Sequence, residues 1–542
     1  MADLTSLLGG PVGSSSAKGP NHEVHVKDYE WAGRLRVAES FNEHMPSTWD
    51  DAFLAAMPTK TAPRVSLAVS TDLKLWNYRY MFEKKGERSL VLDTRLNTMA
   101  EVLHQAFGLA TEWEDPTIPS QESIYTIGRI CLRVNPVKGE ADSAPATKLT
   151  PTDLMLETSR MVGNGQRVAL SLDPKCRVRY AWTDESASMA SVVGLFPGMI
   201  VGLKGRNGSG ARFIAEELLM PPALPHPATS RTELQSHQFH PSKLDGSALR
   251  IVAASGPFTS PDDLAFTPWH AFVSHMERLQ PDVLLVMGPF VSASHPLVAA
   301  GDLDMLPTEL FQQHIATRLT RLMERSPSTM VILVPSTEDI FHPHCAFPQP
   351  FLDKADPVLG LPKRVRCLPN PSVFYVNELA IGVATVDVLG DLRREELVQR
   401  VQPMNPSGTP GPKVTDPMMR LSRHVLGQRS FYPIFPPSPA SNVPLDLSHS
   451  HLCDLDQVTP DLLLLPSSKV KPFVRVVDST VVVNPGTLAQ PTSETQPTAF
   501  VCVQVDPLPR SSVFRSSEEA EELITHELYN RARIDLVHTS TA

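Results

Sequence analysis

Apolar and polar positions alternate in short runs along residues 118–222, and glycine-rich turns separate the runs. The run "SIYTIGRICLRV" (123–134) alternates, and the segments 154–173 and 194–219 each contain two such runs around a turn. Period-two alternation is typical of β-strands, and short glycine-rich turns between the strands predict hairpins. Several short strands within about a hundred residues favour a small barrel. We therefore predict an OB-type β-barrel over residues 118–222.

The pattern changes at residue 248, where largely apolar runs begin to alternate with helical patterns. The strand "LRIVAAS" precedes the helix "PWHAFVSHMERLQ", and "DVLLVMG", "TELFQQHIATRLTRLMER" and "TMVILVP" follow in the same order. A βαβαβ order predicts parallel strands joined by right-handed crossovers. Residues 248–542 are thus expected to form an α/β domain, and the proline-rich stretch 223–247 before it a linker.

The first part of the chain has a weaker pattern. Residues 1–70 lack a steady period and are rich in Gly and Ser, which predicts a mostly disordered tail. Residues 71–115 are expected to be a linker that carries one amphipathic helix, with Ser89 as its N-cap. The apolar positions of that helix are Leu92, Leu96, Met99 and Leu103.

Composition narrows the classes of function. The chain of 542 residues has 49 basic and 59 acidic side chains and a net charge of -10. This balance weighs against tight, non-specific DNA binding. The 6 cysteines have no paired spacing, which weighs against a zinc ribbon and a disulfide framework. No apolar run reaches the roughly 20 residues of a membrane span, so we expect no membrane contact, and no motif calls for a cofactor.

Ligands of α/β folds bind where the strands end, and the successive strand exits here carry small residues and proline. Their order resembles the calcineurin-like metallophosphoesterase fold, which carries D-x-H, G-D-x-x-D, G-N-H and G-H-x-H after successive strands and N-P-G close behind. Two divalent metals need carboxylate and imidazole ligands. The positions that the resemblance assigns to those motifs hold other residues: Ser255, Pro257, Pro289, Ser292, Ser336, Thr337, Ser467 and Lys469. An inactive phosphoesterase fold is therefore expected.

Longer strings extend the resemblance from about residue 76 to the C-terminus: "WNYRYMFEK", "GPFVSASHPLV", "VPSTEDIFHPHCAFPQPF", "SFYPIFPP", "PDLLLLPSSKVKPF" and "VNPGTL". They resemble the B subunits of DNA polymerase alpha–primase, which join an OB fold to an inactive phosphoesterase fold. The resemblance implies a non-catalytic, nuclear accessory subunit. Its partners would be the C-terminal domain of the catalytic subunit and, through the complex, primase. The B subunits of polymerases delta and epsilon share this architecture and are the nearest alternative.

Two alternatives come from other functional classes. A residual metal-dependent phosphodiesterase or nuclease would need ligands from two histidine-containing loops: His342, His344 and Cys345 in one, and His449, His451, Cys453, Asp454 and Asp456 in the other. A nucleic-acid-binding barrel would use aromatic side chains beside cations. The best local candidate for contact with DNA or a partner is "CRVRYAW", with Arg177, Arg179, Tyr180 and Trp182.

Overall fold

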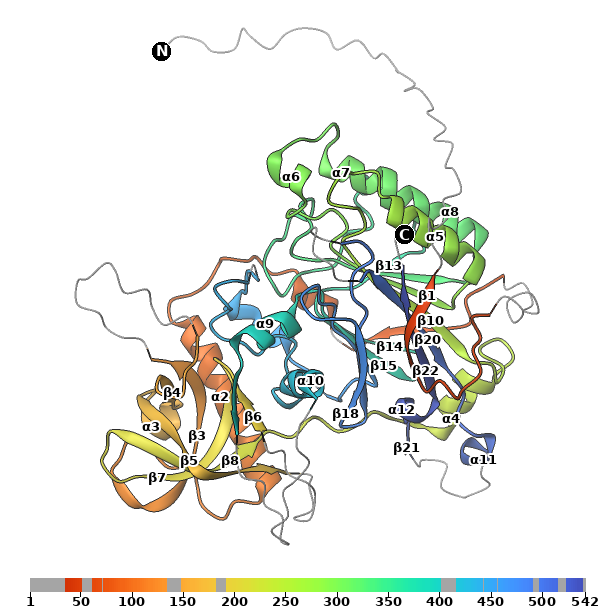
Figure 1. Ribbon diagram of the computed structural model, residues 1–542. Helices are drawn as coiled ribbons and strands as arrows, with labels where there is room; N and C mark the ends of the chain where they lie inside the picture. The colour runs from red at the N-terminus through yellow and green to blue at the C-terminus, as the bar shows by residue number, and fades with distance from the viewer. Residues whose placement is uncertain are drawn as a thin grey trace, which may run out of the picture.

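The computed structural model describes residues 35–50, 61–70, 72–133, 148–181, 192–400, 416–441, 443–455, 457–490, 497–514 and 523–539. These residues form a β-barrel and a larger α/β body that pack against each other (Figure 1). Within the described ranges, no helix is both long enough and apolar enough to cross a membrane.

The barrel is closed and has the strand order β3-β4-β5-β8-β7. Its strands are β3 (Ser120–Leu132), β4 (Leu154–Glu157), β5 (Arg167–Tyr180), β7 (Ile200–Asn207) and β8 (Arg212–Met220). The predicted hairpins are present as the antiparallel pairs β4–β5 and β7–β8. The OB-type barrel predicted from the alternation is confirmed.

Helix α2 (Glu87–Phe107) packs against one side of this barrel. Leu96, Met99 and Leu103 are buried against barrel residues that include Ile127 and Leu219. The expected apolar stripe is therefore present, but the helix begins earlier than expected. Its N-cap is Gly86 at φ 85°, not Ser89, which lies within the first turn.

Two stacked sheets form the α/β body. The seven-stranded sheet has the order β1-β22-β20-β10-β11-β12-β13, and the six-stranded sheet has the order β18-β19-β17-β15-β14-β2. The strands of the first are β1 (Arg36–Phe41), β10 (Leu249–Ser255), β11 (Val283–Met287), β12 (Met330–Val334), β13 (Arg366–Cys367), β20 (Ala499–Val505) and β22 (Ala532–His538). Those of the second are β2 (Leu67–Val69), β14 (Ser372–Val376), β15 (Leu379–Val383), β17 (Leu462–Leu464), β18 (Phe473–Val477) and β19 (Thr480–Asn484).

Strands β10, β11 and β12 are parallel and in register, as the βαβαβ pattern predicts. Successive residues of these strands face opposite sides of the sheet, and nearly all of them are apolar. Both faces of the sheet must therefore be covered. One face packs on the second sheet, and the other packs on α5 (Thr267–Leu279) and α8 (Thr317–Arg325). The free face of the second sheet is covered by α9 (Val388–Glu395) and α10 (Pro417–Gly427). This layering matches the expected phosphoesterase-like sandwich.

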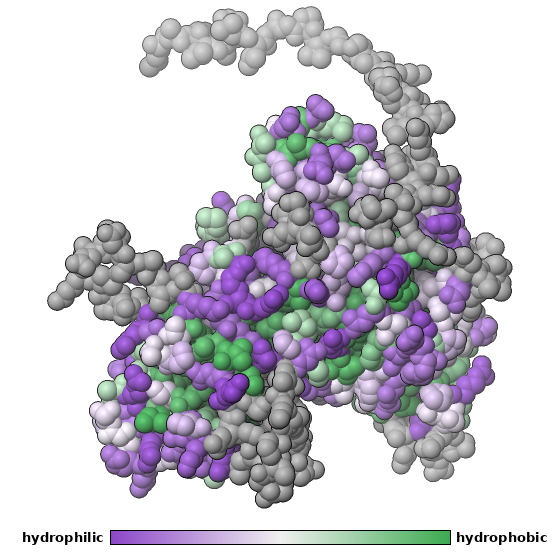
Figure 2. Space-filling view, viewed as in Figure 1, coloured by the Kyte–Doolittle hydropathy of each residue, from purple (hydrophilic) through white to green (hydrophobic). Residues whose placement is uncertain are grey.

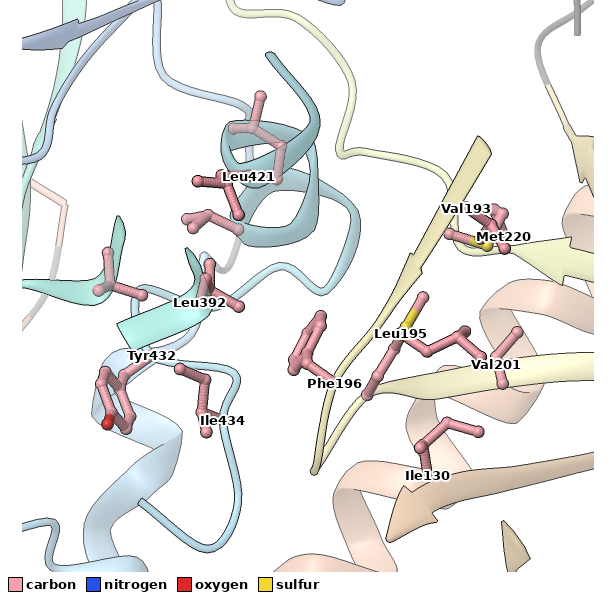
Figure 3. Close-up of a cluster of buried hydrophobic side chains, with 14 of the residues drawn as sticks. Ile130, Val193, Leu195, Phe196, Val201, Met220, Leu392, Leu421, Tyr432 and Ile434 are labelled. Atoms are coloured by element: carbon pink, nitrogen blue, oxygen red, sulfur yellow. The ribbon is translucent and has the colours of Figure 1, made fainter. Parts of the chain in front are cut away.

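The barrel and the α/β body share one apolar core. Figure 3 shows Phe196 from the barrel side directed toward Ile434 and Tyr432, with Leu392 and Leu421 of α9 and α10 nearby. A two-stranded sheet also crosses the junction, because β6 (Val192–Leu195) pairs with β16 (Leu397–Arg400) of the body. The two parts are therefore joined by packing and by backbone hydrogen bonds.

Two strands lie in the segment for which the sequence predicted a mostly disordered tail. Strand β1 pairs antiparallel with β22, and β2 pairs antiparallel with β14, so each adds an edge strand to a sheet. The prediction is wrong for these residues because their partners lie more than three hundred positions away along the chain. The expected linker 223–247 likewise contains β9 (Ala228–Ser230), which pairs with β21 (Leu523–Thr525).

Candidate functional site

The strand exits of the two sheets meet around one pocket of about 130 Å³. Seven of the eight positions that were aligned with phosphoesterase motifs line it: Ser255, Pro257, Pro289, Ser336, Thr337, Ser467 and Lys469. The eighth, Ser292, lies beside the pocket, where its hydroxyl is 2.8 Å from the hydroxyl of Ser294 and 3.3 Å from Glu338 Oε2. Seven of the eight positions thus lie around one pocket, and hydroxyls and proline rings make up much of its wall.

The loop after β11 is held by a carboxylate that the sequence analysis did not single out. Asp339 is 4% exposed and accepts hydrogen bonds from the backbone N–H groups of Phe290 (2.5 Å), Val291 (3.1 Å) and Ser336 (2.8 Å). Burial raises the pKa of Asp339 to about 7, although these three bonds act in the opposite direction. Asp339 therefore fixes the exits of β11 and β12 relative to each other.

Asn484, in the string "VNPG", fixes the opposite wall of the pocket. Its Oδ1 accepts from the N–H groups of Ser467 (2.9 Å) and Gly486 (2.9 Å), and its Nδ2 donates to the carbonyl of Val470 (2.9 Å). The side chain is fully buried. An amide supplies the acceptor and donors that this loop requires, so Asn484 stabilises the conformation of the loop.

Lys469 places a positive charge at the pocket next to two carboxylates. Its Nζ lies 3.9 Å from Asp391 Oδ1, and the other oxygen of Asp391 accepts a hydrogen bond of 2.9 Å from the Tyr432 hydroxyl. Burial raises the pKa of Asp387, while a hydrogen bond from Ser467 and the charge of Lys469 oppose that rise. A protein ammonium thus partly neutralises the acidic groups near the pocket, where the resembled enzymes hold a metal ligand.

The two histidine-containing loops meet in space, but a tyrosine ring lies between them. Tyr78 stacks on His449 with ring centroids 3.8 Å apart, and it lies edge-on to His344 at 4.8 Å. Burial lowers the pKa of His342 to about 4, and its Nδ1 accepts from the N–H of His344 at 3.1 Å. Among the residues that the structure describes, which exclude Asp456, no group of three or more His, Cys, Asp or Glu side chains could hold a metal ion.

The side chains of strand β5 that were candidates for contact with nucleic acid lie in different surroundings. Arg177 is exposed, whereas Arg179 lies 3.3 Å from Glu217 Oε2 and has its guanidinium 5.3 Å above the ring of Phe107. Tyr180 faces the α/β body, where the guanidinium of Arg423 lies 5.8 Å from its ring centre. Trp182 lies outside the described residues. The structure thus leaves Arg177 alone, of the three described residues, fully available on this strand.

Comparison with known proteins decides between the remaining families. A family model described as the B subunit of DNA polymerase alpha/epsilon matches residues 251–475, and one described as the OB domain of the DNA polymerase alpha B subunit matches residues 89–182. A Schizosaccharomyces pombe protein, named as the B subunit of DNA polymerase alpha, is 30% identical over 496 residues, which cover 89% of this chain and 78% of that protein. The chain belongs to the DNA polymerase alpha B-subunit family.

Other relatives with the same name extend this family relationship. The Saccharomyces cerevisiae protein is 31% identical over 86% of this chain and 66% of its own length. The Bos taurus protein is 26% identical over 74% of this chain, and the match spans 57% of the cattle protein. The resemblance noted in the sequence is confirmed, and the alpha family is favoured over the delta and epsilon alternatives because the matching barrel model is described as that of alpha.

Proposed function

We propose that this chain is a non-catalytic accessory subunit of the DNA polymerase alpha–primase complex. In this proposal it binds the C-terminal domain of the catalytic subunit and couples that subunit to primase in the nucleus at the initiation of replication. The observation that carries the proposal is membership of the alpha B-subunit family over 89% of the chain. Fold alone would not carry it, because one fold serves many functions.

The chemistry of the pocket supports a non-catalytic role. Phosphodiester hydrolysis by two metals requires ligands that neutralise the ions and activate a water. Proline at positions 257 and 289 has no side-chain ligand atom, and the ammonium of Lys469 adds positive charge. We infer that serine and proline replaced the ligands because a ring of carboxylates without metal destabilises the fold through repulsion between like charges.

The junction between barrel and body supports a scaffolding role. Gln428 of the body accepts from the N–H of Ile200 (2.9 Å) and donates to its carbonyl (2.8 Å), so one side chain satisfies both backbone groups of a barrel residue. Arg429 donates to the carbonyl of Pro222 (3.1 Å). Large apolar junctions resist relative motion of their two parts, and here one apolar cluster contains residues of both. A partner can therefore bind a continuous surface made of both the barrel and the body.

A groove between α2 and the body is our proposed contact site for the catalytic subunit's C-terminal domain. It has a volume of about 490 Å³, with Leu90, Val91 and Val102 of α2 on one side and Leu224 and Leu455 on the other. Figure 2 shows apolar residues gathered at the surface in the region of α2. A partner seated there would contact both parts of the scaffold, and large exposed apolar patches mark such interfaces.

Co-purification tests the proposal. The chain is mixed with the isolated C-terminal domains of the alpha, delta and epsilon catalytic subunits, and each mixture is run on size exclusion. A stable complex with the alpha domain alone is expected. Binding to the delta or epsilon domain instead, or to none, would contradict the proposal.

A single substitution tests the proposed contact site in the same assay. Leu90 is 57% exposed, so Leu90→Asp is expected to leave the fold intact and to weaken the complex by at least about tenfold. The matched control is Leu306→Asp, which makes the same change at a side chain that is 64% exposed on the α/β body, away from α2. Equal binding by both variants would place the contact site elsewhere.

A further inference from the structure

The segment Lys74–Arg88, which we call the 74–88 strip, is fixed to the body on one side and open to solvent on the other. Trp76 is 2% exposed, and the Tyr78 ring stacks on His449. The hydroxyl of Tyr78 donates to the carbonyl of Pro348. Tyr80 packs edge-on to His344 with ring centroids 4.7 Å apart. These contacts hold alternate aromatic side chains against the body.

The strip turns outward at its centre. Met81 has a φ of 58°, a left-handed conformation that is unusual for a residue with a side chain. Beyond this bend, Met81 is 86% and Phe82 is 70% exposed. The guanidinium of Arg79 lies 5.3 Å from the centre of the Phe82 ring. The anchored loop thus presents a flat ring and a planar cation together, and it leaves the apolar side chains of Met81 and Phe82 exposed to solvent.

The charge on the strip is opposite in sign to that of the whole chain. Lys74, Arg79, Lys84 and Lys85 are exposed, and within the described residues none of them forms an ion pair. Both acidic groups of the strip are already engaged: the carboxylate of Glu83 pairs with Arg88, and that of Glu87 accepts from the N–H of Lys84 at 2.8 Å. Their charges are therefore partly compensated locally, and a local positive surface remains on a chain of net charge -10.

We propose that the 74–88 strip binds single-stranded nucleic acid. Proteins that bind single strands without sequence preference combine cations that follow the phosphates with aromatic rings on which bases stack. The strip offers both, with Phe82 and Arg79 for stacking and Lys84 and Lys85 for phosphates. An acidic polypeptide would satisfy the cations, but only its aromatic residues could stack on Phe82, whereas every base of a single strand presents a flat face. This inference does not depend on the proposed contact with the catalytic subunit.

Fluorescence anisotropy with the full chain tests this inference. The probe is an oligothymidylate of about 20 nucleotides, which exceeds the roughly 4–16 nucleotides of small single-strand sites. Phe82→Ala is expected to weaken binding about tenfold, because one stacked base is lost. Lys84→Ala with Lys85→Ala is expected to lower the slope of log affinity against log salt by about 1.4, since each phosphate contact on a single strand contributes about 0.7.

Matched controls separate stacking from charge and from folding. Lys363→Ala with Arg366→Ala removes two exposed cations elsewhere, and Met161→Ala truncates an exposed apolar side chain; both are expected to bind like the parent chain. Poly-aspartate of equal charge is expected to compete poorly. Undiminished binding by the strip variants, or equal competition by poly-aspartate, would overturn the inference. So would a Phe82→Ala chain that loses the polymerase domain but keeps the oligonucleotide.

Discussion

The imidazole Nε2 of His424 lies 2.8 Å from Glu396 Oε1 at the junction between the barrel and the α/β body, and both side chains are almost completely buried. Arg420 adds two further bonds to the same carboxylate, at 2.8 and 2.9 Å. Gly194 of strand β6 packs directly against the Glu396 carboxylate and the His424 ring. A buried carboxylate with three charge-assisted bonds is costly to disrupt, so this cluster makes the junction sensitive to pH and to small changes in volume.

The Glu396 cluster predicts a specific dependence of stability on pH. Burial alone would raise the pKa of Glu396, but hydrogen bonds and charge from His424 and Arg420 outweigh it and lower the pKa from 4.5 to about 2. A lowered pKa in the folded state stabilises the fold above pH 4.5, and this contribution is lost as the pH falls toward 2. We expect Glu396→Gln to lower the free energy of unfolding at pH 7 by on the order of 3 kcal/mol.

Chemical unfolding at several pH values checks this expectation. The difference between the parent chain and Glu396→Gln should shrink steadily between pH 4.5 and pH 2. The control is Glu122→Gln, which changes an exposed carboxylate and should have little effect at any pH. A difference that stays constant through this range would show that the carboxylate does not stabilise the fold through its ionised form.

Gly194 predicts a second effect at the same place. A Cβ atom there would lie 1.8 Å from Glu396 Oε1 and 2.8 Å from His424 Nε2, so Gly194→Ala must push the buried pair apart. Overpacking of this kind costs about 1–3 kcal/mol. The melting temperature, measured by scanning calorimetry, should fall. Gly208→Ala is the control, since a Cβ there would meet only the flexible end of Gln121 at 3.2 Å.

Elements whose contacts are local could be predicted from the sequence. The runs that became β11 and β12 are fully apolar, and that of β10 is mostly so, because both faces of their sheet are covered. The barrel hairpins alternate around short turns. Strand β1 has the polar sequence "RVAESF" and pairs with β22 about five hundred positions away. Nothing local distinguishes such an edge strand from a loop.

The candidate site shows the same limit. The strand-exit positions come together around one pocket because parallel strands end at one edge of a sheet. The burial of Asp339 could not be read from "PSTED", since it depends on two loops folding over one carboxylate. The meeting of the histidine loops around Tyr78 joins three segments that are far apart in the chain. Only the "VNPG" string signalled Asn484, and it did not indicate which groups the amide would bond.

The two hydrogen bonds of Gln428 should contribute to the stability of the junction between the barrel and the body. It is 2% exposed and makes both of its bonds to the backbone of Ile200, so Gln428→Ala leaves a buried N–H and a buried carbonyl without partners. Each such group costs about 1–3 kcal/mol. We expect a lower melting temperature and faster cleavage between barrel and body in limited proteolysis. Gln105→Ala, at an exposed position of α2, should leave both measurements unchanged.

Metal removal should leave the folded chain unaffected. Among the described residues no cluster of three ligating side chains exists, and the positively charged Lys469 lies at the pocket beside Asp391. A structural metal would contribute folding free energy that a chelator removes. We therefore expect the same melting temperature in EDTA and in excess Mn²⁺, and no hydrolysis of a generic phosphodiester above the rate in buffer.

Reversing the charge near the acidic groups with Lys469→Glu should still give no hydrolysis, because the side chains of Pro257 and Pro289 supply no ligand atoms. A metal-dependent rate in either chain, abolished by His342→Ala or His449→Ala, would instead show that the histidine loops form an active site.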